Sequence, residues 1–250
     1  MNPVALITGA TSAIGAAAAL AFAEAGYSVA LAARRVQILN SVAAEIEQRG
    51  GRALAVGADV TQVTDVDKVV SRTLARFGRL DVAFNNAGSG ARPTPLADLS
   101  EKTFEHTMRV NVLGTFLCMR AEILAIVEHG GGAIVNMSST AGLQGVAGLS
   151  PYCAGKYAIV GMSKAAALDY ADKNVRINVV APGPIATERI DKEQQQRIGQ
   201  YVPVKRVGQP SEVAELVRWL CSPSAAFITG AVVPIDGGRL AGVPSFAAGS

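Results

Sequence analysis

The sequence has few of the residues that build disulfide frameworks, metal sites or nucleic-acid surfaces. Its 250 residues include three cysteines and two histidines, and only 5% are aromatic. Cys118, Cys153 and Cys221 are an odd number without metal-ligand spacing, so we expect no disulfide or metal site, and a cytoplasmic location fits. Charged residues make up 17%, and 23 basic against 20 acidic residues give a net charge of +3 without a polybasic run. This weak charge favours neither a nucleic-acid nor a membrane partner.

Apolar residues form half of the chain, and the mean hydropathy of +0.29 raises the question of a membrane span. Between Pro3 and Ala33 the only charge is Glu24. A span needs about 20 consecutive apolar residues, but three glycines and several hydroxyl residues interrupt this stretch. The basic start of a signal peptide is also missing. We therefore expect no membrane segment here, but a strand at Val4–Thr8, a helix at Ile14–Ala25 and a strand at Ser28–Ala33.

Short β-branched runs alternate with longer helical stretches along the whole chain. Thr64, with Asp67 three residues later, resembles a capping box, and Ser100 before Glu101 marks another helix start. Several strands are apolar on both faces, as in a parallel sheet covered on both sides. The pattern predicts one α/β domain over residues 1–250, with a doubly wound (Rossmann), mostly parallel seven-stranded sheet and helices on both faces. The predicted strands are Val4–Thr8, Ser28–Ala33, Arg52–Gly57, Leu80–Asn85, Ala133–Met137, Arg176–Ala181 and Ala231–Ile235.

A glycine-containing turn follows the first predicted strand. Gly9 permits a tight turn, and Gly15 lets the following helix approach the sheet closely. The helix N-terminus offers amide donors and partial positive charge to a pyrophosphate. Ala13 stands where a third glycine is expected, and an ordinary turn is the alternative interpretation. The pattern predicts a dinucleotide site that contains Gly9, Thr11, Ser12, Ala13, Ile14 and Gly15.

A second set of residues has the chemistry of an acid–base site. Tyr152 and Lys156 are four residues apart in a predicted helix and share one face. A neighbouring ammonium is expected to lower the phenol pKa from its ordinary value near ~10, which makes the tyrosine a usable general acid and base. Ser139 ends a predicted strand, and its hydroxyl can donate to a carbonyl oxygen. An exposed helix pair is the alternative for Tyr152 and Lys156 alone.

Together these motifs resemble the short-chain dehydrogenase/reductase family, from Val4 to about Gly238. Asn111 matches the family's catalytic asparagine and completes a tetrad with Ser139, Tyr152 and Lys156. Further matching segments are the cofactor turn Thr8–Gly15, Asp59–Val60, Asn85–Gly88, Val110–Gly114, Pro182–Thr187 and Asp236–Gly238.

The resemblance implies reversible hydride transfer between a nicotinamide cofactor and a carbonyl or secondary alcohol. Ser139 would polarise the carbonyl, and Tyr152 would protonate its oxygen. Lys156 would lower the tyrosine pKa and bind the nicotinamide ribose, and Asn111 would hold a water that links the lysine to solvent. Besides the turn, the implied cofactor-binding residues are Asp59, Val60, Asn86, Ala87, Gly88, Tyr152, Lys156, Pro182, Gly183, Ile185 and Thr187.

Cofactor preference depends on the end of the second strand. An NAD site needs an acidic residue there, whereas a 2′-phosphate favours arginine. Ala33 occupies that position, and Arg34 and Arg35 follow it. Arg34 can pair with a phosphate bidentately, although an exposed arginine pair is the alternative interpretation. We therefore expect NADP, with NAD as the less favoured alternative.

The resemblance leaves the substrate open. It places the pocket at Ser139, Leu143, Gln144, Val146, Leu149 and Tyr152, which suits a hydrophobic or moderately polar ketone. Residues 187–210 are expected to form a substrate-binding lid, and residues 240–250 a C-terminal tail.

Two other functions are considered beside carbonyl reduction. An acyl-carrier-linked 3-oxoacyl ketoreductase has the same motifs, and the scattered Arg120, Arg189, Lys192 and Lys205 do not decide for or against it. A non-catalytic NADP-binding regulator would not need the complete tetrad. His106 and His129 lack partners at ligand spacing, which argues against a zinc-dependent alcohol dehydrogenase. By resemblance we expect a homotetramer or dimer that pairs the helices near 102–128 and 151–172.

Overall fold

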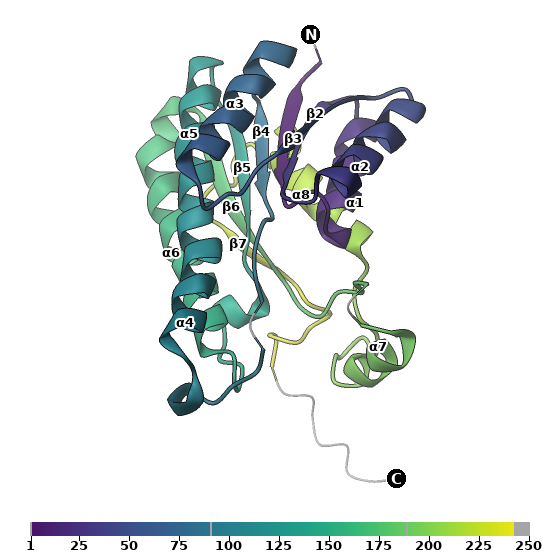
Figure 1. Cartoon of the computed structure of the whole chain (residues 1–250), viewed down its shortest axis with the longest axis vertical. Helices are drawn as coiled ribbons and strands as arrows, with labels where there is room; N and C mark the ends of the chain where they lie inside the picture. Colours follow the sequence, from purple (N-terminus) through teal and green to yellow (C-terminus); the bar gives the residue numbers. More distant parts are fainter. Residues whose placement is uncertain (1, 91, 189, 243–250) are drawn as a thin grey trace.

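The computed structural model describes residues 2–90, 92–188 and 190–242. Its seven strands form one parallel sheet in the order β3-β2-β1-β4-β5-β6-β7, which confirms the predicted doubly wound α/β fold (Figure 1). The chain winds outward from β1 in one direction and then in the other, so a crevice forms where the direction changes. The strands are β1 Val4–Thr8, β2 Ser28–Ala33, β3 Arg52–Gly57, β4 Val82–Asn85, β5 Gly132–Met137, β6 Val175–Pro182 and β7 Val232–Ile235.

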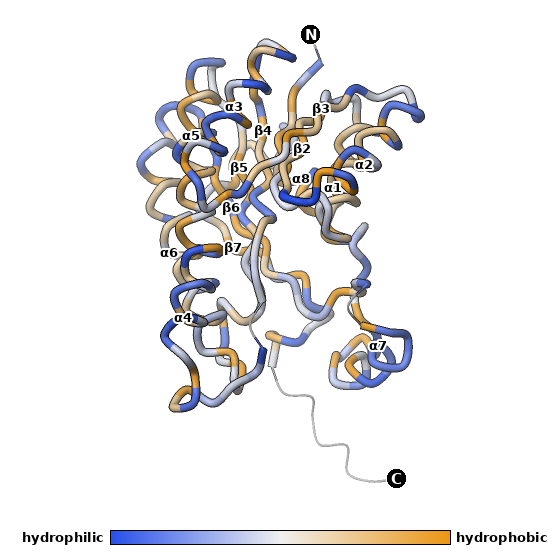
Figure 2. The backbone as a smooth tube through the Cα atoms, viewed as in Figure 1, coloured by the Kyte–Doolittle hydropathy of each residue, from blue (hydrophilic) through white to orange (hydrophobic). Residues whose placement is uncertain are grey.

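Helices cover both faces of this sheet. The strand period of two sends Ala5 and Ile7 into the core beneath α1, α2 and α8, and Val4 and Leu6 into the core beneath α3, α5 and α6. In Figure 2 the strands are largely hydrophobic, whereas the outer turns of the helices are hydrophilic. The helices are α1 Ala13–Glu24, α2 Val36–Gln48, α3 Val63–Phe77, α4 Glu101–Met108, α5 Gly114–Glu128, α6 Ser150–Tyr170, α7 Lys192–Gly199 and α8 Pro210–Cys221.

One of the two predicted helix starts is confirmed. The Ser100 side chain caps α4 by accepting from the Thr103 amide at 3.2 Å. The capping box predicted at Thr64 is wrong, because α3 begins earlier, after Gln62. The first turn of α3 is instead tied to the preceding loop, since the Asp65 carboxylate accepts from the Asp59 amide at 2.9 Å.

The helical run Glu101–Glu128 contains a π-helical turn at Arg109–Leu113 between α4 and α5. By length and composition alone this run could cross a membrane, but 56% of its most apolar window is buried inside the protein. It packs against the sheet and α3, as a core helix does. The π turn brings Asn111 into the interior, and such turns are frequent at functional sites.

The carboxyl ends of the central strands meet at one edge of the sheet. Thr8 of β1 lies beside Asn85 of β4, and Asn85 lies beside Asn136 of β5. This register brings the turn after β1, the segment after β4 and the serines after β5 to one edge. Of the predicted C-terminal tail, residues 243–250 lie outside the described part of the chain.

Candidate nucleotide and catalytic site

The turn after β1 has a shape that only glycine permits at two positions. Gly9 has a φ of +63°, and a Cβ there would lie 2.8 Å from the Ala87 Cα. A Cβ at Gly15 would overlap the Gly9 carbonyl oxygen. Both glycines therefore let the backbone, rather than a side chain, form the surface at the first turn of α1.

Side chains brace this turn from the neighbouring strand end. Asn86 donates from Nδ2 to the carbonyl oxygens of Thr8 and Gly9, at 3.2 and 3.0 Å, and to Ser12 Oγ at 3.0 Å. The Ala87 amide donates to Thr8 Oγ1 at 3.2 Å. Ser12 caps α1 by accepting from the Gly15 amide. The turn and the Asn86 segment are therefore one braced unit.

A cavity of about 340 Å³ extends from this turn toward the ends of β2 and β3. Ala33 and Arg34 line its far end together with Asp59, as the sequence predicts for the adenosine side of a dinucleotide. Because a Cβ at Gly9 would collide with the backbone, the cavity has the backbone-lined cradle that a pyrophosphate requires. Its lining is Gly9, Thr11, Ser12, Ala32, Ala33, Arg34, Arg35, Ala58, Asp59, Val60, Asn86, Ala87, Gly88 and Val110.

The two arginines after β2 differ in their surroundings. Arg35 donates to the Thr11 carbonyl oxygen at 2.7 Å and to its hydroxyl at 3.1 Å, so it also braces the turn. Arg34 is exposed, and it makes no ion pair among the described residues. Asp59 closes a turn, because its Oδ1 accepts from the Thr61 amide and hydroxyl at 2.9 Å, and it also lines the cavity.

A second cavity, of about 320 Å³, shares Thr11, Ser12, Arg35, Asn86 and Gly88 with the first and therefore adjoins it. It leads to Tyr152 and Lys156. The two cavities thus connect the predicted adenosine end to the predicted catalytic residues. The rest of the second lining is Ala13, Ser89, Gly90, Asn111, Met137, Tyr152, Lys156, Thr187 and Glu188.

Lys156 is buried, and burial lowers its pKa to about 8. Its Nζ donates to the Met137 carbonyl oxygen at 2.8 Å and lies 5.5 Å from the Tyr152 ring centroid. The expected lowering of the Tyr152 pKa is wrong for this state of the protein. Burial raises the pKa of Tyr152, and the opposing hydrogen bond with Ser139 does not offset it. The ammonium lies over the ring and is held by a carbonyl, so it does not reverse the desolvation of the phenol.

Ser139 and Asn111 hold the backbone around this cavity. Ser139 Oγ accepts from the Ala141 amide at 3.2 Å at the start of a short 3₁₀ turn. Asn111 Nδ2 donates to the carbonyl oxygens of Ser89 and Thr107, at 2.8 and 3.0 Å, and its Oδ1 accepts from the Ser89 amide. Asn111 therefore anchors the segment after β4. Its predicted water-holding role stays a prediction.

Several predicted site residues line neither of these two cavities. Ile14 and Gly15 pack α1 onto the sheet and the turn. Ile185 lines a separate cavity of about 100 Å³ with Val202 and Arg206. The other residues outside both linings are the cofactor candidates Pro182 and Gly183 and the substrate candidates Ser139, Leu143, Gln144, Val146 and Leu149, whose substrate contacts stay predictions.

The sequence interpretation missed two features near the site. Met137 lines the second cavity and its carbonyl oxygen holds Lys156, yet no motif marks this residue. Glu122 is a buried acid on α5 that hydrogen bonds to Asn85. The available signal was an acid directly before the apolar run Ile123–Val127.

The sheet is doubly wound, and its central crevice joins a backbone-lined cradle to a buried lysine and a half-buried tyrosine. These features together define the class of nicotinamide-dinucleotide oxidoreductases. The family model described as Enoyl-(Acyl carrier protein) reductase matches residues 9–239. The chain belongs to the short-chain dehydrogenase/reductase family. It is an oxidoreductase of that type, and its activity is NAD(P)-dependent interconversion of carbonyl and alcohol groups.

Curated relatives cover nearly the whole chain. An A-factor type gamma-butyrolactone 1′-reductase (1S-forming) of Streptomyces virginiae is 40% identical over 242 residues, 94% of both chains. A cyclohexanol dehydrogenase of Acinetobacter sp. (strain SE19) is 41% identical over 236 residues, again 94% of both chains. A 3-oxoacyl-[acyl-carrier-protein] reductase of Synechocystis sp. is 39% identical over 239 residues, 95% of this chain and 96% of the relative.

Solved structures show the same fold. Levodione reductase superposes with a TM-score of 0.93 at 32% identity, covering 96% of this chain and 98% of its own. ElxO with NADP bound superposes with a TM-score of 0.90 at 33% identity, covering 97% of this chain and 100% of its own. An actinorhodin polyketide ketoreductase variant with NADPH gives 0.91 at 33% identity, with coverage of 95% and 97%.

Proposed function

We propose that the protein is an NADPH-dependent reductase of a hydrophobic or moderately polar ketone. The observation that carries this proposal is the end of β2. Ala33 provides no carboxylate for a ribose 2′-hydroxyl, and the exposed Arg34 lines the same cavity. Two structural relatives solved with NADP or NADPH support this preference.

The proposed catalytic group is Tyr152 with Lys156, Ser139 and Asn111. A bound nicotinamide supplies the hydride. Tyr152 donates its phenolic proton to the carbonyl oxygen of the substrate, so that ketone, hydride and proton become the alcohol. The buried Lys156 stabilises the resulting phenolate, and Ser139 donates a hydrogen bond to the same oxygen. Asn111 keeps the segment after β4 in place beside the lysine.

Residues 187–210 are proposed as the lid over the substrate. Thr187 and Glu188 already border the second cavity. Within this segment α7 starts at a capping box formed by Asp191 and Gln194. A formed helix that follows a cavity rim suits a segment that closes as one unit. Arg189 lies outside the described residues.

The cofactor test compares two arginine variants with both nucleotides. Arg34→Ala should raise the KM for NADPH about tenfold or more and the KM for NADH little, because only NADPH carries the 2′-phosphate. Arg72→Ala, an exposed arginine on α3 that lines neither cavity, is the matched control. Equal effects of Arg34→Ala on both nucleotides would overturn the NADP assignment.

The substrate test follows NADPH absorbance over a panel of cyclic ketones and 3-oxoacyl thioesters. The panel includes thioesters because one relative acts, by its name, on a carrier-bound 3-oxoacyl group, which makes that class the second candidate. Turnover of simple cyclic ketones without a carrier supports the first proposal. Turnover restricted to carrier-bound thioesters would replace it with the second.

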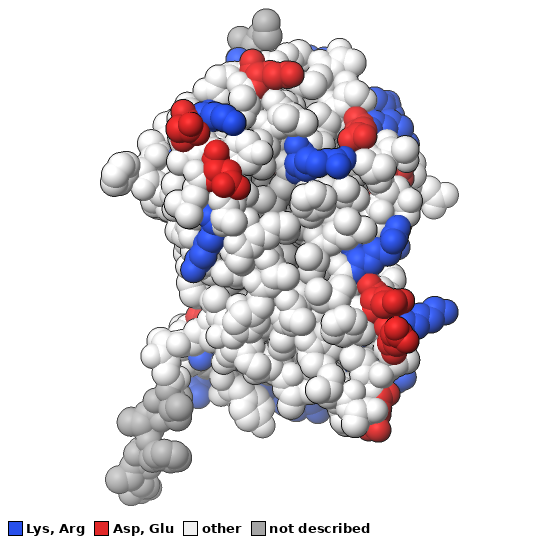
Figure 3. Space-filling model, turned by 90° about the vertical axis from the view of Figure 1, so that its left-hand side faces the viewer, with Lys and Arg blue, Asp and Glu red and all other residues white. Residues whose placement is uncertain are grey.

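We also propose that the protein is a cytoplasmic homotetramer or dimer. The face formed over α4, α5 and α6 carries few charges across its middle (Figure 3). Phe116, Leu124, Tyr157 and Leu168 are exposed on α5 and α6, with Leu168 82% exposed. Exposed large apolar side chains on a face with few charges favour self-association. Light scattering should give two or four chain masses, and a monomer at micromolar concentration would contradict the proposal.

A further inference from the structure

A network of buried, hydrogen-bonded polar side chains lies next to the proposed active site. Its members are Glu122, Asn85, Asn136 and Ser163. Asn85 donates from Nδ2 to Glu122 Oε2 at 2.7 Å and to Asn136 Oδ1 at 3.0 Å. Asn136 donates to Ser163 Oγ at 2.9 Å, and Ser163 donates to the Ile159 carbonyl oxygen at 2.6 Å. The four side chains are at most 3% exposed and come from α5, β4, β5 and α6.

This buried network connects the nucleotide turn with the backbone that holds Lys156. Asn85 directly precedes Asn86, which braces the nucleotide turn through Gly9 and Ser12. Asn136 directly precedes Met137, whose carbonyl oxygen holds Lys156. Asn85 is therefore one peptide unit away from the side chain that braces the nucleotide turn.

Two atoms of this buried network have no hydrogen-bond partner among the described residues: Glu122 Oε1 and Asn85 Oδ1. A carboxylate oxygen and an amide oxygen can only accept, so neither satisfies the other while Glu122 is ionised. A proton on Oε1 would make that atom a donor, and the unpaired Oδ1 belongs to the same amide that already donates to Oε2. The Asn85 amide and the Glu122 acid would then be joined by two hydrogen bonds, one in each direction.

The surroundings of Glu122 favour the neutral acid. Asn85 is its only hydrogen-bond partner, and no cation pairs with it among the described residues. Burial raises the pKa of Glu122 to about 8, and the hydrogen bond with Asn85 opposes this only in part. Among the described residues, Cys118 is the one other titratable side chain that lines the small cavity bordered by Glu122. Burial raises the pKa of this thiol well above its ordinary value. The groups facing Glu122 from β1, β2, α3 and the loop after β3 are Leu6, Thr8, Ala32, Ala58, Val60, Val66, Val69 and Val70, and β6 adds Val175 and Ile177 to this core.

We propose that Glu122 is a positioning residue, a neutral carboxylic acid that fixes Asn85 through two hydrogen bonds and thereby holds the Asn85–Gly88 segment in its nucleotide-binding shape. The proposal deepens the proposed function and rests on nucleotide binding at that segment. Loss of the proton leaves a buried carboxylate without a counter-charge, and its Oε1 and Asn85 Oδ1 then both lack a hydrogen-bond donor. Nucleotide affinity should then fall without any change in the residues that touch the nucleotide.

Infrared spectroscopy of the protein without nucleotide tests the protonation state directly. The difference spectrum between wild type and Glu122→Gln should contain the carbonyl stretch of one protonated carboxylic acid at pH 7. Glu128→Gln, an exposed position on the same helix, is the matched control and should contribute only carboxylate bands. Carboxylate bands alone from Glu122 at pH 7 would overturn the proposal. This measurement needs no substrate, so it is independent of whether the protein reduces ketones.

Nucleotide titrations between pH 6.5 and 9.5 test the positioning role. Glutamine has one donor and one acceptor, as the neutral acid does, so Glu122→Gln should match the wild-type Kd for NADPH at pH 6.5. Glu122→Leu removes both hydrogen bonds and should raise the Kd about tenfold while kcat at saturation changes less. As pH rises through about 8, wild type should lose affinity more steeply than Glu122→Gln. Lys156 also titrates there, but its contribution is present in both proteins.

The comparison of wild type with Glu122→Gln remains valid even if Glu122→Leu fails to fold. Identical pH profiles for these two proteins would overturn the proposal. Failure of NADPH and NADH to bind either protein, with the acid band present, would instead refute the proposed function and leave Glu122 as a structural acid.

Discussion

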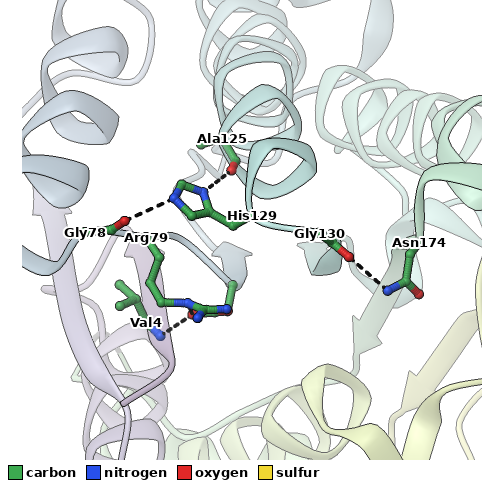
Figure 4. Close-up of polar contacts among 8 residues, drawn as sticks. Val4, Gly78, Arg79, Ala125, His129, Gly130 and Asn174 are labelled. Atoms are coloured by element: carbon green, nitrogen blue, oxygen red, sulfur yellow. Dashed lines mark hydrogen bonds and ion pairs between the residues drawn. The ribbon is translucent and has the colours of Figure 1, made fainter. Parts of the chain in front are cut away.

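The two edges of the sheet use polar residues differently. At the amino edge, polar groups are paired with one another: the Asp81 carboxylate accepts from the Val4 amide at 2.7 Å and from Arg79 Nε at 2.9 Å (Figure 4). The two ring nitrogens of His129 lie 2.7 and 3.0 Å from the carbonyl oxygens of Ala125 and Gly78, and the nitrogen that carries the proton donates to its carbonyl. At the carboxyl edge, buried ionisable groups lack counter-charges, and side chains face cavities. The difference separates residues that hold the fold from residues kept available for a ligand.

The pKa shifts follow this division. Burial raises the pKa of Glu122 to about 8 and lowers the pKa of Lys156 to about 8. Neither shift is offset, because neither group has a partner of opposite charge. At the amino edge, the Arg79 guanidinium hydrogen bonds to Asp81, which raises the pKa of Arg79 and keeps it charged. Perturbed groups at a cavity are candidates for function, whereas a satisfied ion pair is a structural contact.

The largest expected effect concerns the carboxyl edge. Tyr152→Phe removes the proposed proton donor and should lower kcat about 10³-fold. NADPH binding should weaken far less, and the unfolding temperature should stay near that of wild type. Stopped-flow NADPH oxidation with the best ketone of the panel measures the rate. Retention of most of the wild-type kcat would remove Tyr152 from the mechanism.

The second prediction uses the pH dependence of stability. Glu122 holds its proton in the folded state up to about pH 8 but loses it near 4.5 when unfolded. Its stabilising contribution is thus complete below pH 4.5 and declines toward pH 8, by up to a few kcal/mol. Lys156 has the opposite sign: its folded pKa of about 8 is below the ordinary 10.5, so stability rises between these values. Urea unfolding across this range should show that Glu122→Gln loses the decline and Lys156→Met loses the rise. Parallel plots of unfolding free energy against pH for wild type and both variants would contradict this prediction.

The third prediction separates backbone strain from ligand binding. Gly9→Ala places a Cβ against the Ala87 backbone and should weaken NADPH binding about tenfold or more, because the turn must open. Gly26→Ala is the matched control, since Gly26 also has positive φ (+86°) but meets nothing within 4 Å. It should lower stability and leave the Kd unchanged. Isothermal titration gives both affinities, and equal Kd changes in the two variants would refute the cradle.

The fourth prediction concerns the amino edge. Asp81→Asn removes the charge that pairs with Arg79 and should lower the free energy of unfolding by about 1–2 kcal/mol. The nucleotide Kd and kcat should match wild type, because this contact lies at the end of the sheet opposite the cavities. Denaturant unfolding and steady-state kinetics measure the two quantities. A tenfold loss of kcat would show that the two edges are coupled.

The smallest expected effect is at His129, on the same edge. His129→Ala loses its contacts with the carbonyl oxygens of Ala125 and Gly78, at 2.7 and 3.0 Å, and should cost about 1 kcal/mol of stability. His106→Ala, at an exposed position on α4, should change nothing measurable. Thermal unfolding of the two variants side by side provides the comparison. An unchanged midpoint for His129→Ala would mean that these contacts contribute no net stability.

The sequence alone determined the order of the elements and the position of the nucleotide turn. Strands apolar on both faces and glycines at fixed positions are local signals. The strand ends were therefore predicted to within about two residues. Gly9 was correctly placed in the turn after β1, and Gly15 at the start of the following helix. The spacing of Tyr152 and Lys156 likewise placed both side chains at one cavity. The resemblance added Asn111, which no local pattern would have selected.

Only the tertiary structure decided how these groups behave. Burial reversed the expected pKa shift of Tyr152, and Asp65 rather than Thr64 ordered the start of α3. Glu122 looked like an ordinary helix residue until packing placed it beneath Asn85 without a counter-charge. Spacing along the chain fixes which side chains share a face. Desolvation and hydrogen-bond partners depend on which elements close around that face, and those are contributed by residues far away in the sequence.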